Sequence, residues 1–337
     1  MAYWQQLVVK VAVVLVLVPT ATAIIVQTFL YKMMAHMQSR LGPMEAGPHG
    51  VIQLVADGAK FFQKELVLPA RADRWVFAMA PVVVLLSTFL LFVVVPAGPN
   101  LVAEDLDVGV FFALAVSSIS VLGILMAGWA SANKYALIGG LRAAGQLIAY
   151  ELPLVLAVVG VVIQAETLSL QGMVRAQAEG AVFGFDGLGQ PFILTQFVGF
   201  ALFLVATQAE LTQPPFDMPV AESELVAGYQ VEYSGLQFLF FYLAEFASAF
   251  VFAALAATMF LGGWYVPGLD LAGGVLSNVV GPVVLFAKTM LVALLIFWIR
   301  FTYPRLREDQ LQTFAWKYLI PLSLLNILAT GVFKVVL

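Results

Sequence analysis

The stretch Phe238–Leu261 reads FLFFYLAEFASAFVFAALAATMFL, and a single charged residue, Glu245, interrupts its apolar run. A membrane-spanning helix needs about 20 predominantly apolar residues. The stretch must be helical because the bilayer offers no partners for open backbone groups. A charged acid at mid-bilayer costs about 2.5 to more than 10 kcal/mol. The stretch therefore predicts a transmembrane helix that carries an acid for a structural or functional reason.

The rest of the chain repeats this apolar character in separate runs. They are centred near Val18, Leu86, Val121, Val158, Phe200, Leu294 and Leu324, beside the one near Phe250. The chain is 62% hydrophobic and 11% charged, whereas soluble proteins have about 45–50% and about 25%. We expect an all-α polytopic membrane protein with eight transmembrane helices, forming one membrane domain over residues 1–337. The absence of an internal repeat weighs against an inverted-repeat carrier.

Lysine and arginine are distributed unevenly between the two sides that eight spans would create. One side holds Lys32, Arg40, Lys60, Lys64, Arg71, Arg74, Lys134, Arg142, Arg300, Arg305, Arg307 and Lys317, and the other holds only Lys10, Arg175, Lys288 and Lys334. Cytoplasmic loops carry the excess of these residues. Both termini are therefore expected on the outer side of the cell inner (plasma) membrane, with lipid around the spans. The net charge of −4 argues against a nucleic-acid partner.

Residues 33–74 form the first expected cytoplasmic loop, in which Gly42-Pro43 and Gly47-Pro48 break any continuing helix. A helical pattern follows. Its apolar face carries Val51, Val55, Ala59, Phe62 and Leu66, and its polar face carries Gln53, Asp57, Lys60 and Lys64. This pattern predicts an amphipathic helix at the membrane interface. It is either a surface anchor, which we favour, or one wall of a cavity entrance.

Residues 209–235 form a second unusual loop, which is acidic although it lies on the basic side. It contains Glu210, Asp217, Glu222, Glu224 and Glu232, and no lysine or arginine. A solvated loop is the ordinary interpretation. The acids alternate with Phe216, Met218, Leu225, Val226 and Tyr229, which resemble packed residues. We therefore favour a partly buried acid cluster.

Three acids lie within or at the ends of apolar runs: Glu151, Glu210 and Glu245. Each alone could make a helix–helix hydrogen bond, whereas a series of such acids is what a proton relay needs. The chain has no cysteine, which excludes thiolate-held iron–sulfur clusters. His36 and His49 lack metal-ligand spacing. No metal or cofactor is therefore expected to be bound by this chain's own ligands.

Four sets of motifs follow one another along almost the whole chain. They are Gln38–Pro43 with Gly47-Pro48; Gly128–Ser131 with Lys134-Tyr135 and Tyr150-Glu151; Pro215-Phe216-Asp217 with Glu222–Val226 and Glu232-Tyr233; and Tyr303-Pro304-Arg305 with Asp309-Gln310 and Trp316-Lys317. Together they resemble the H-type subunit family of respiratory complex I (NADH-quinone oxidoreductase), which is equivalent to mitochondrial NADH dehydrogenase subunit one.

That resemblance implies a membrane subunit of a proton-translocating NADH-quinone oxidoreductase with no complete active site of its own. Quinone would be the substrate, and FMN and iron–sulfur clusters would lie in partner subunits. Partners would be peripheral iron–sulfur subunits and small and antiporter-like membrane subunits. The implied proton relay is Glu151, Glu210, Asp217, Glu222, Glu224, Glu232 and Glu245. The implied quinone tunnel and interface residues are Arg40, Asp57, Lys60, Lys64, Gln213, Phe216, Arg300 and Arg305.

The chain departs from the family pattern at three places. Leu30-Tyr31-Lys32 stands where the family usually has Glu-Arg-Lys, Gln213 stands where it has arginine, and Val220 replaces an acid. Without an arginine at 213, the pKa values of Asp217 and Glu222 should rise and the quinone headgroup path should change. Two alternatives are the anchor subunit of a membrane-bound hydrogenase and an independent ion transporter. The motifs around Asp309-Gln310 and Trp316-Lys317 favour the complex I family.

Overall fold

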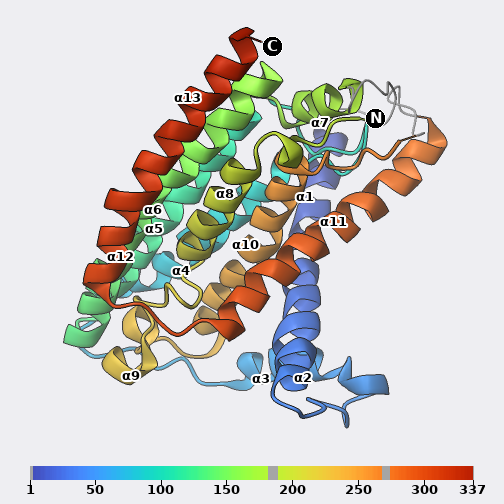
Figure 1. Cartoon of the computed structure of the whole chain (residues 1–337). Helices are drawn as coiled ribbons and strands as arrows, with labels where there is room; N and C mark the ends of the chain where they lie inside the picture. The colour runs from blue at the N-terminus through green and yellow to red at the C-terminus, as the bar shows by residue number, and fades with distance from the viewer. Residues whose placement is uncertain (1–2, 181–188, 268–273, 337) are drawn as a thin grey trace.

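A computed structural model of the chain describes residues 3–180, 189–267 and 274–336, apart from the side chain of Glu222. These residues form helices and loops without any strand (Figure 1). The all-α prediction is therefore confirmed for the described residues. The helix α1 begins and α13 ends at the same end of the bundle, whereas α2, α3 and α9 lie at the opposite end (Figure 1).

Within the described residues, seven helices are long and apolar enough to cross a membrane, so the chain is a multi-pass membrane protein. Their segments are α1 (Tyr3–Ile25), which continues through η1 (Val26–Met33) into α2 (Met34–Met37); α4 (Arg74–Val93); α5 (Gly109–Ala130); α6 (Lys134–Ala165); α10 (Gly235–Phe260); α11 (Val275–Thr302); and α12 (Glu308–Phe314), which continues through η5 (Ala315–Leu319) into α13 (Ile320–Val336). Seven of the eight expected spans are thus confirmed as helices of sufficient length.

The eighth expected span, centred near Phe200, corresponds to α8 (Phe197–Glu210), which has only 14 residues. At about 1.5 Å per residue it is about 21 Å long, which is less than the roughly 30 Å of a hydrocarbon core. The preceding chain is a short 3₁₀ turn, η3 (Phe192–Leu194), rather than a continuation of α8. That α8 crosses the membrane stays a prediction.

Two of the membrane-crossing helices contain π-helical segments, η1 and η5. A π-helix bonds each residue five positions along the chain instead of four, and it commonly occurs at functional sites. Tyr31 lies inside η1. The first span therefore changes its helical geometry just before it reaches the loop of residues 33–74.

The amphipathic pattern after Gly47-Pro48 forms the helix α3 (Gln53–Gln63), preceded by η2 (Pro48–Gly50). Its apolar Val55 and Phe62 are each 70% exposed, while Asp57 on its polar face accepts a hydrogen bond from Tyr31. Asp57 therefore faces the protein together with Leu54 and Phe61, which pack against the bundle, whereas Val55 and Phe62 do not. The remaining short elements are α7 (Leu170–Glu179), α9 (Glu222–Leu225) and η4 (Gly228–Gln230).

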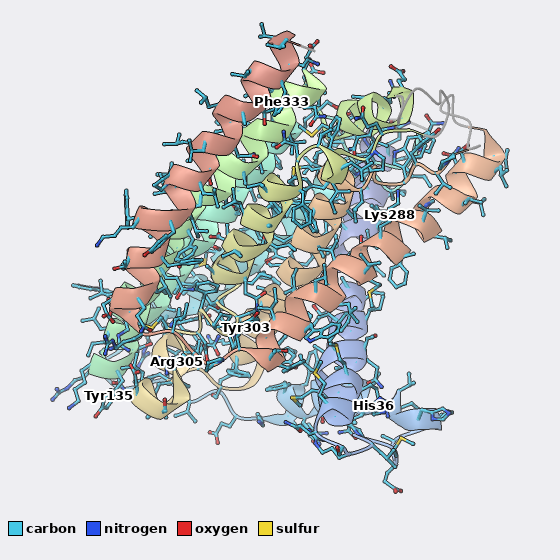
Figure 2. The ribbon with its side chains drawn as sticks, in the orientation of Figure 1. His36, Tyr135, Lys288, Tyr303, Arg305 and Phe333 are labelled. Carbon is cyan, nitrogen blue, oxygen red and sulfur yellow. The ribbon has the colours of Figure 1, made fainter. Side chains whose placement is uncertain are left out.

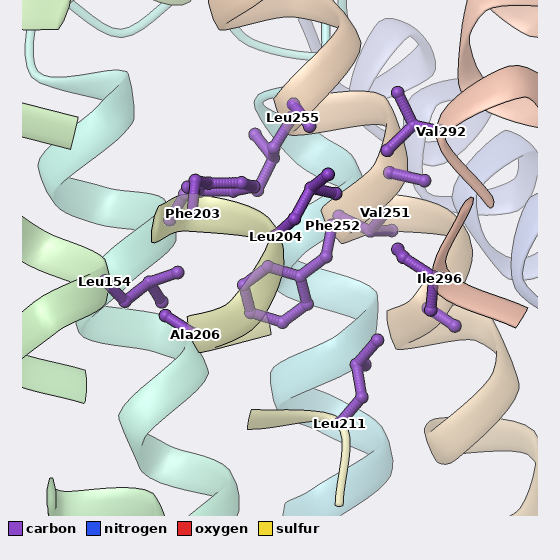
Figure 3. Packing of buried hydrophobic residues seen from close by; sticks show 14 of the residues in the cluster. Leu154, Phe203, Leu204, Ala206, Leu211, Val251, Phe252, Leu255, Val292 and Ile296 are labelled. Carbon is purple, nitrogen blue, oxygen red and sulfur yellow. The ribbon is translucent and has the colours of Figure 1, made fainter. Parts of the chain in front are cut away.

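The core is built around α10, which packs against α1, α4 and α11. Phe252 and Val251 of α10 lie beside Phe203 of α8 and Ile296 of α11 (Figure 3). Many small residues on α10, such as Ala249 and Ala253, are fully buried and allow its neighbours to approach closely. The helix α10, whose apolar run opened the sequence analysis, therefore lies at the centre of the bundle and places Glu245 inside the bundle.

Candidate functional site: a junction of two cavities at Glu245

The chain turns sharply after α8, and this turn positions Gln213. Four residues, Gln213 to Phe216, form a turn with a cis Pro214-Pro215 bond, in which the Phe216 amide donates to the Gln213 carbonyl at 2.9 Å. Gln146 of α6 holds both sides of the turn, since its Nε2 donates to the carbonyls of Ala209 and Phe216, each at 2.7 Å. The side chain of Gln213 is thereby buried to 1% exposure beside α10.

Gln213 connects the carboxylate of Glu245 on α10 with the guanidinium of Arg300 on α11. Its Nε2 donates to Glu245 Oε1 at 2.5 Å, and its Oε1 accepts from Nη1 of Arg300. Arg300 Nη1 also lies 4.0 Å from Glu245 Oε1. Arg300 therefore supplies Glu245 with a countercharge although residue 213 is neutral. The expected rise in the pKa values of Asp217 and Glu222 stays a prediction.

Aromatic rings fix the position of Arg300. Its guanidinium carbon lies 5.7, 5.9 and 5.8 Å from the ring centres of Phe246, Phe297 and Phe301. A guanidinium within about 6 Å of such rings is attracted to their electron-rich faces. The positive charge is thus held at the end of α11 next to Glu245.

A cavity of about 650 Å³ opens beside this trio at the end of the bundle that carries α9. Its lining includes Asp217, Gln213, Tyr242, Glu245, Arg300 and Arg305. Figure 2 shows Arg305 on the segment that follows α11, beside α9. Such a volume, with a few charged and polar groups among apolar ones, is typical of a small-molecule site.

A second, small cavity of about 60 Å³ lies on the other side of Glu245. Glu245 and Thr212 line both cavities, and Glu210 lines the small one. The hydroxyls of Thr88 and Ser248 meet there at 2.9 Å. Glu210 Oε2 is buried and has no hydrogen-bond partner among the described residues. Water takes up about 30 Å³ per molecule, so the small cavity has the size and polarity to hold water between two carboxylates.

Among the described acids of residues 209–235, Glu224 and Glu232 pair away from Glu210, so the single acid cluster favoured from sequence is wrong for these two. Glu224 pairs with Arg142 at 2.6 Å and Arg305 at 3.3 Å, and the hydrogen bond from Arg142 is the main reason that the pKa of Glu224 lies below its ordinary value. Glu232 accepts from Asn133 Nδ2 at 2.6 Å. The side chain of Glu222 lies outside the described part of the structure.

The loop is nevertheless packed rather than solvated. Of the five apolar residues between the acids, Phe216, Met218, Leu225 and Tyr229 are between 3% and 6% exposed, and Val226 is 64% exposed. Glu151, the remaining relay candidate, lies on α6, makes a hydrogen bond with Ser118 and interacts electrostatically with Glu210.

The predicted tunnel residues divide into two groups. Gln213, Arg300 and Arg305 line the larger cavity together with Asp217. The others do not: Asp57 binds Tyr31 at 2.6 Å and Lys60 at 3.2 Å, Lys64 lies over the Phe61 ring at 4.9 Å, Arg40 donates to Gln38 at 2.8 Å, and Phe216 packs against Tyr150.

Four polar residues around Glu245 and α9 were missed from sequence: Tyr242, Ser248, Thr88 and Arg142. Tyr242 and Ser248 lie three positions before and after Glu245 on α10, which places all three on one face of the helix. That spacing was the available signal. Thr88 and Arg142 had none, because their partners come from distant parts of the chain.

Comparison with known proteins agrees with the motifs. The family model for NADH dehydrogenase matches residues 9–331. The chain is 43% identical to the NADH-quinone oxidoreductase H subunit of Phocaeicola vulgatus over 94% of this chain and 88% of that protein. It is 45% identical to the H subunit of Brevibacillus brevis over 90% and 86%, and 41% identical to an H subunit of Geobacter metallireducens over 98% and 96%. Sequence matches of this extent, on a bundle of seven membrane-length helices, establish that the chain belongs to the NADH dehydrogenase family.

Proposed function

We propose that this chain is the H-type membrane subunit of an NADH-quinone oxidoreductase in a bacterial plasma membrane. With its partners it would form the quinone tunnel and couple quinone reduction to proton translocation. The observation that carries the proposal is the position of Glu245, which separates a substrate-sized cavity of about 650 Å³ from a small polar cavity that reaches Glu210.

The chemistry of the larger cavity supports quinone as its ligand. Reduction of a quinone to a quinol consumes two electrons and two protons, so the headgroup needs proton donors nearby. Tyr242, Asp217 and Glu245 are the titratable groups along the lining that can supply or pass protons, and Arg300 and Arg305 can stabilise a developing negative charge on oxygen. Electrons must come from partner subunits, where FMN and iron–sulfur clusters are proposed to lie.

The arrangement of the bundle supports the proposed topology. Because α1 begins and α13 ends at one end of the bundle (Figure 1), an even number of passes is needed, and α8 supplies the eighth. Residues 33–74 and 209–235 then face the cytoplasm, within one membrane domain of residues 1–337. The exposed Val55 and Phe62 of α3 would rest in the lipid interface.

The cytoplasmic end of this bundle is where peripheral iron–sulfur subunits are proposed to dock, and antiporter-like membrane subunits are proposed to contact the bundle from the side. A hydrogenase anchor and an independent transporter remain the competing functions. A tagged chain purified from its own membranes in mild detergent should bring iron–sulfur subunits and NADH-dependent quinone reduction with it. A chain that is isolated alone would contradict both complex-based functions.

A test of the proposed coupling replaces each carboxylate with its neutral amide. In Glu245→Gln and Glu210→Gln complexes, NADH-dependent quinone reduction should fall at least about ten-fold, because an amide cannot relay a proton and such transfers contribute about 10²–10⁴-fold. Proton translocation in membrane vesicles should fall with it.

Glu179→Gln is the matched control, since Glu179 is exposed on α7 at the opposite end of the bundle. This variant should retain the turnover of the unmodified complex. Full turnover and pumping in both Glu245→Gln and Glu210→Gln, in complexes shown to be assembled, would remove these acids from the proton path.

A further inference from the structure

We propose that Gln213 is a positioning residue that keeps Arg300 linked to Glu245 while preventing the two from forming a direct ion pair. The inference rests on the proposed role of Glu245 as a proton carrier. It assigns to the neutral amide a task that a charged residue at this position could not perform.

The two ends of the amide determine its orientation. A glutamine offers donors at Nε2 and an acceptor at Oε1. A carboxylate can only accept and a guanidinium can only donate, so Nε2 must face Glu245 and Oε1 must face Arg300, as observed. The side chain is 1% exposed on the wall of the larger cavity, and its two hydrogen bonds and the backbone turn held by Gln146 keep it in this position.

The spacing shows what the amide prevents. The one contact between Arg300 and Glu245 within ion-pair range is 4.0 Å long. A direct arginine–carboxylate pair has two parallel hydrogen bonds and is among the strongest polar contacts in proteins. A carboxylate held in such a pair stays ionised and cannot take up a proton for transfer. The inserted amide leaves Glu245 hydrogen-bonded and near a positive charge, yet free to change its protonation state.

Other charged and titratable groups around Glu245 do not offer the same contact. Asp217 and Tyr229 interact with Glu245 electrostatically from the loop after α8, and Tyr242 does so from the preceding turn of α10. Arg305 lines the same cavity, but its guanidinium pairs with Glu224 at 3.3 Å. Among the described residues, Arg300 is therefore the cation placed to capture Glu245 when the amide is removed.

The test is a double-mutant experiment in the intact complex, with turnover measured at saturating short-chain quinone. Gln213→Leu keeps the side chain's bulk and removes both hydrogen bonds, so Arg300 can close on Glu245. We expect turnover to fall about ten-fold. Adding Arg300→Gln to this variant removes the capturing charge. Because Arg300 also lines the larger cavity, the double variant is compared with Arg300→Gln alone, and Gln213→Leu should lower the turnover of that variant less than about two-fold.

This comparison separates the role from simple packing, because a damaged packing contact at position 213 would slow turnover about ten-fold with or without Arg300. Gln213→Met, which is unbranched, provides a second version of the same test if the leucine variant assembles poorly. Unchanged turnover in Gln213→Leu, or a further ten-fold loss when Gln213→Leu is added to Arg300→Gln, would overturn the inference. An assembled Glu245→Gln complex with full turnover would instead overturn the proposed function on which it rests.

Discussion

Asp57 joins α3 to the first span through a short hydrogen bond from the Tyr31 hydroxyl. Burial disfavours the ionised carboxylate, but the hydrogen bonds from Tyr31, Lys60 and Gln53 outweigh burial and hold the pKa of Asp57 below its ordinary value. A hydrogen bond to a charged group contributes about 1.5–3 kcal/mol. No residue of α3 is fully buried, so this contact holds the helix together with Leu54 and the stacking of Phe61 on Phe238.

Tyr31→Phe should therefore loosen α3 without unfolding the bundle. Amide hydrogen exchange across residues 53–63 should become at least about ten-fold faster, since each 1.36 kcal/mol corresponds to a factor of ten. Tyr303→Phe, which alters an exposed hydroxyl beyond the end of α11 (Figure 2), is the control and should leave exchange in α3 unchanged. Equal exchange in both variants would show that Asp57 does not hold the helix.

The same contact has a defined pH dependence. Because the pKa of Asp57 is lower in the folded protein than its unfolded value of about 3.9, its stabilising contribution is fully present above about pH 4. It is lost as the pH falls through the lower, folded value. Protection of α3 should thus be constant from pH 5 to 8, roughly the range in which proteins are most stable.

At the residue level, charge was the feature that sequence revealed best. Glu245 and Glu210 were recognised because an acid in an apolar run is costly. Thr88, Ser248 and Tyr242 escaped notice because uncharged polar residues are common in membrane helices and often only bond their neighbours. The partners of Glu224 could not be predicted, since Arg142 lies 82 positions away along the chain.

At the level of elements, Ser248 of α10 and Thr88 of α4 line the small cavity that also contains Glu245 and Glu210. Thr88→Val keeps the shape of the side chain and removes the hydroxyl that meets Ser248. Since hydroxyls can both donate and accept protons, we expect proton translocation to fall about two- to five-fold, with quinone affinity unchanged because Thr88 does not line the larger cavity.

Ser323→Ala is the control for that measurement on α13, where the buried hydroxyl bonds the Leu319 carbonyl at 2.8 Å and lines neither cavity. An equal loss of pumping in Ser323→Ala would assign the effect to packing rather than to the path. Unchanged pumping in Thr88→Val would exclude the hydroxyl pair.

Helix positions were predictable where the apolar run was long, and less so at its ends. The run around Phe200 gave α8, but the helix begins only at Phe197 because residues 192–194 form a 3₁₀ turn after Pro191. The segments η1 and η5 had no sequence signal, since a single π turn is too short to produce a period of its own. The polar face of α3 was expected from the pattern, but its partner Tyr31 was not.

For the whole molecule, orientation in the membrane can be tested directly because the chain has no cysteine. Glu179→Cys introduces an exposed thiol at the end of α7, and Arg71→Cys introduces one in the segment between α3 and α4. The helices α7 and α3 lie at opposite ends of the bundle (Figure 1). A membrane-impermeant maleimide added to intact cells should label Glu179→Cys and leave Arg71→Cys unlabelled. Both should react after the membranes are dissolved in sodium dodecyl sulfate. Labelling of Arg71→Cys in intact cells would reverse the proposed topology.

The exposed helical surface also has a meaning at this scale. Leu328 and Phe333 of α13 are 67% and 63% exposed, and that helix lies at the edge of the bundle (Figure 1). Soluble proteins rarely expose a continuous apolar surface of this kind to water. Lipid and neighbouring subunits are proposed to cover this surface. The composition already required an apolar surrounding, and the structure shows which helices expose apolar side chains to it.

The π-helical segment η1 makes the first span unusually sensitive to changes in chain length. Successive residues of an α-helix are rotated by about 100° around its axis. Deleting one residue between Val26 and Leu30 would let η1 return to ordinary α geometry while keeping the downstream face in place, whereas deleting one from α1 would turn Tyr31 away from Asp57. A one-residue deletion in this span should therefore be harmless within η1 and harmful elsewhere before Met33. In alignments of related chains, we expect a single-residue gap at η1 and at no other position before Met33.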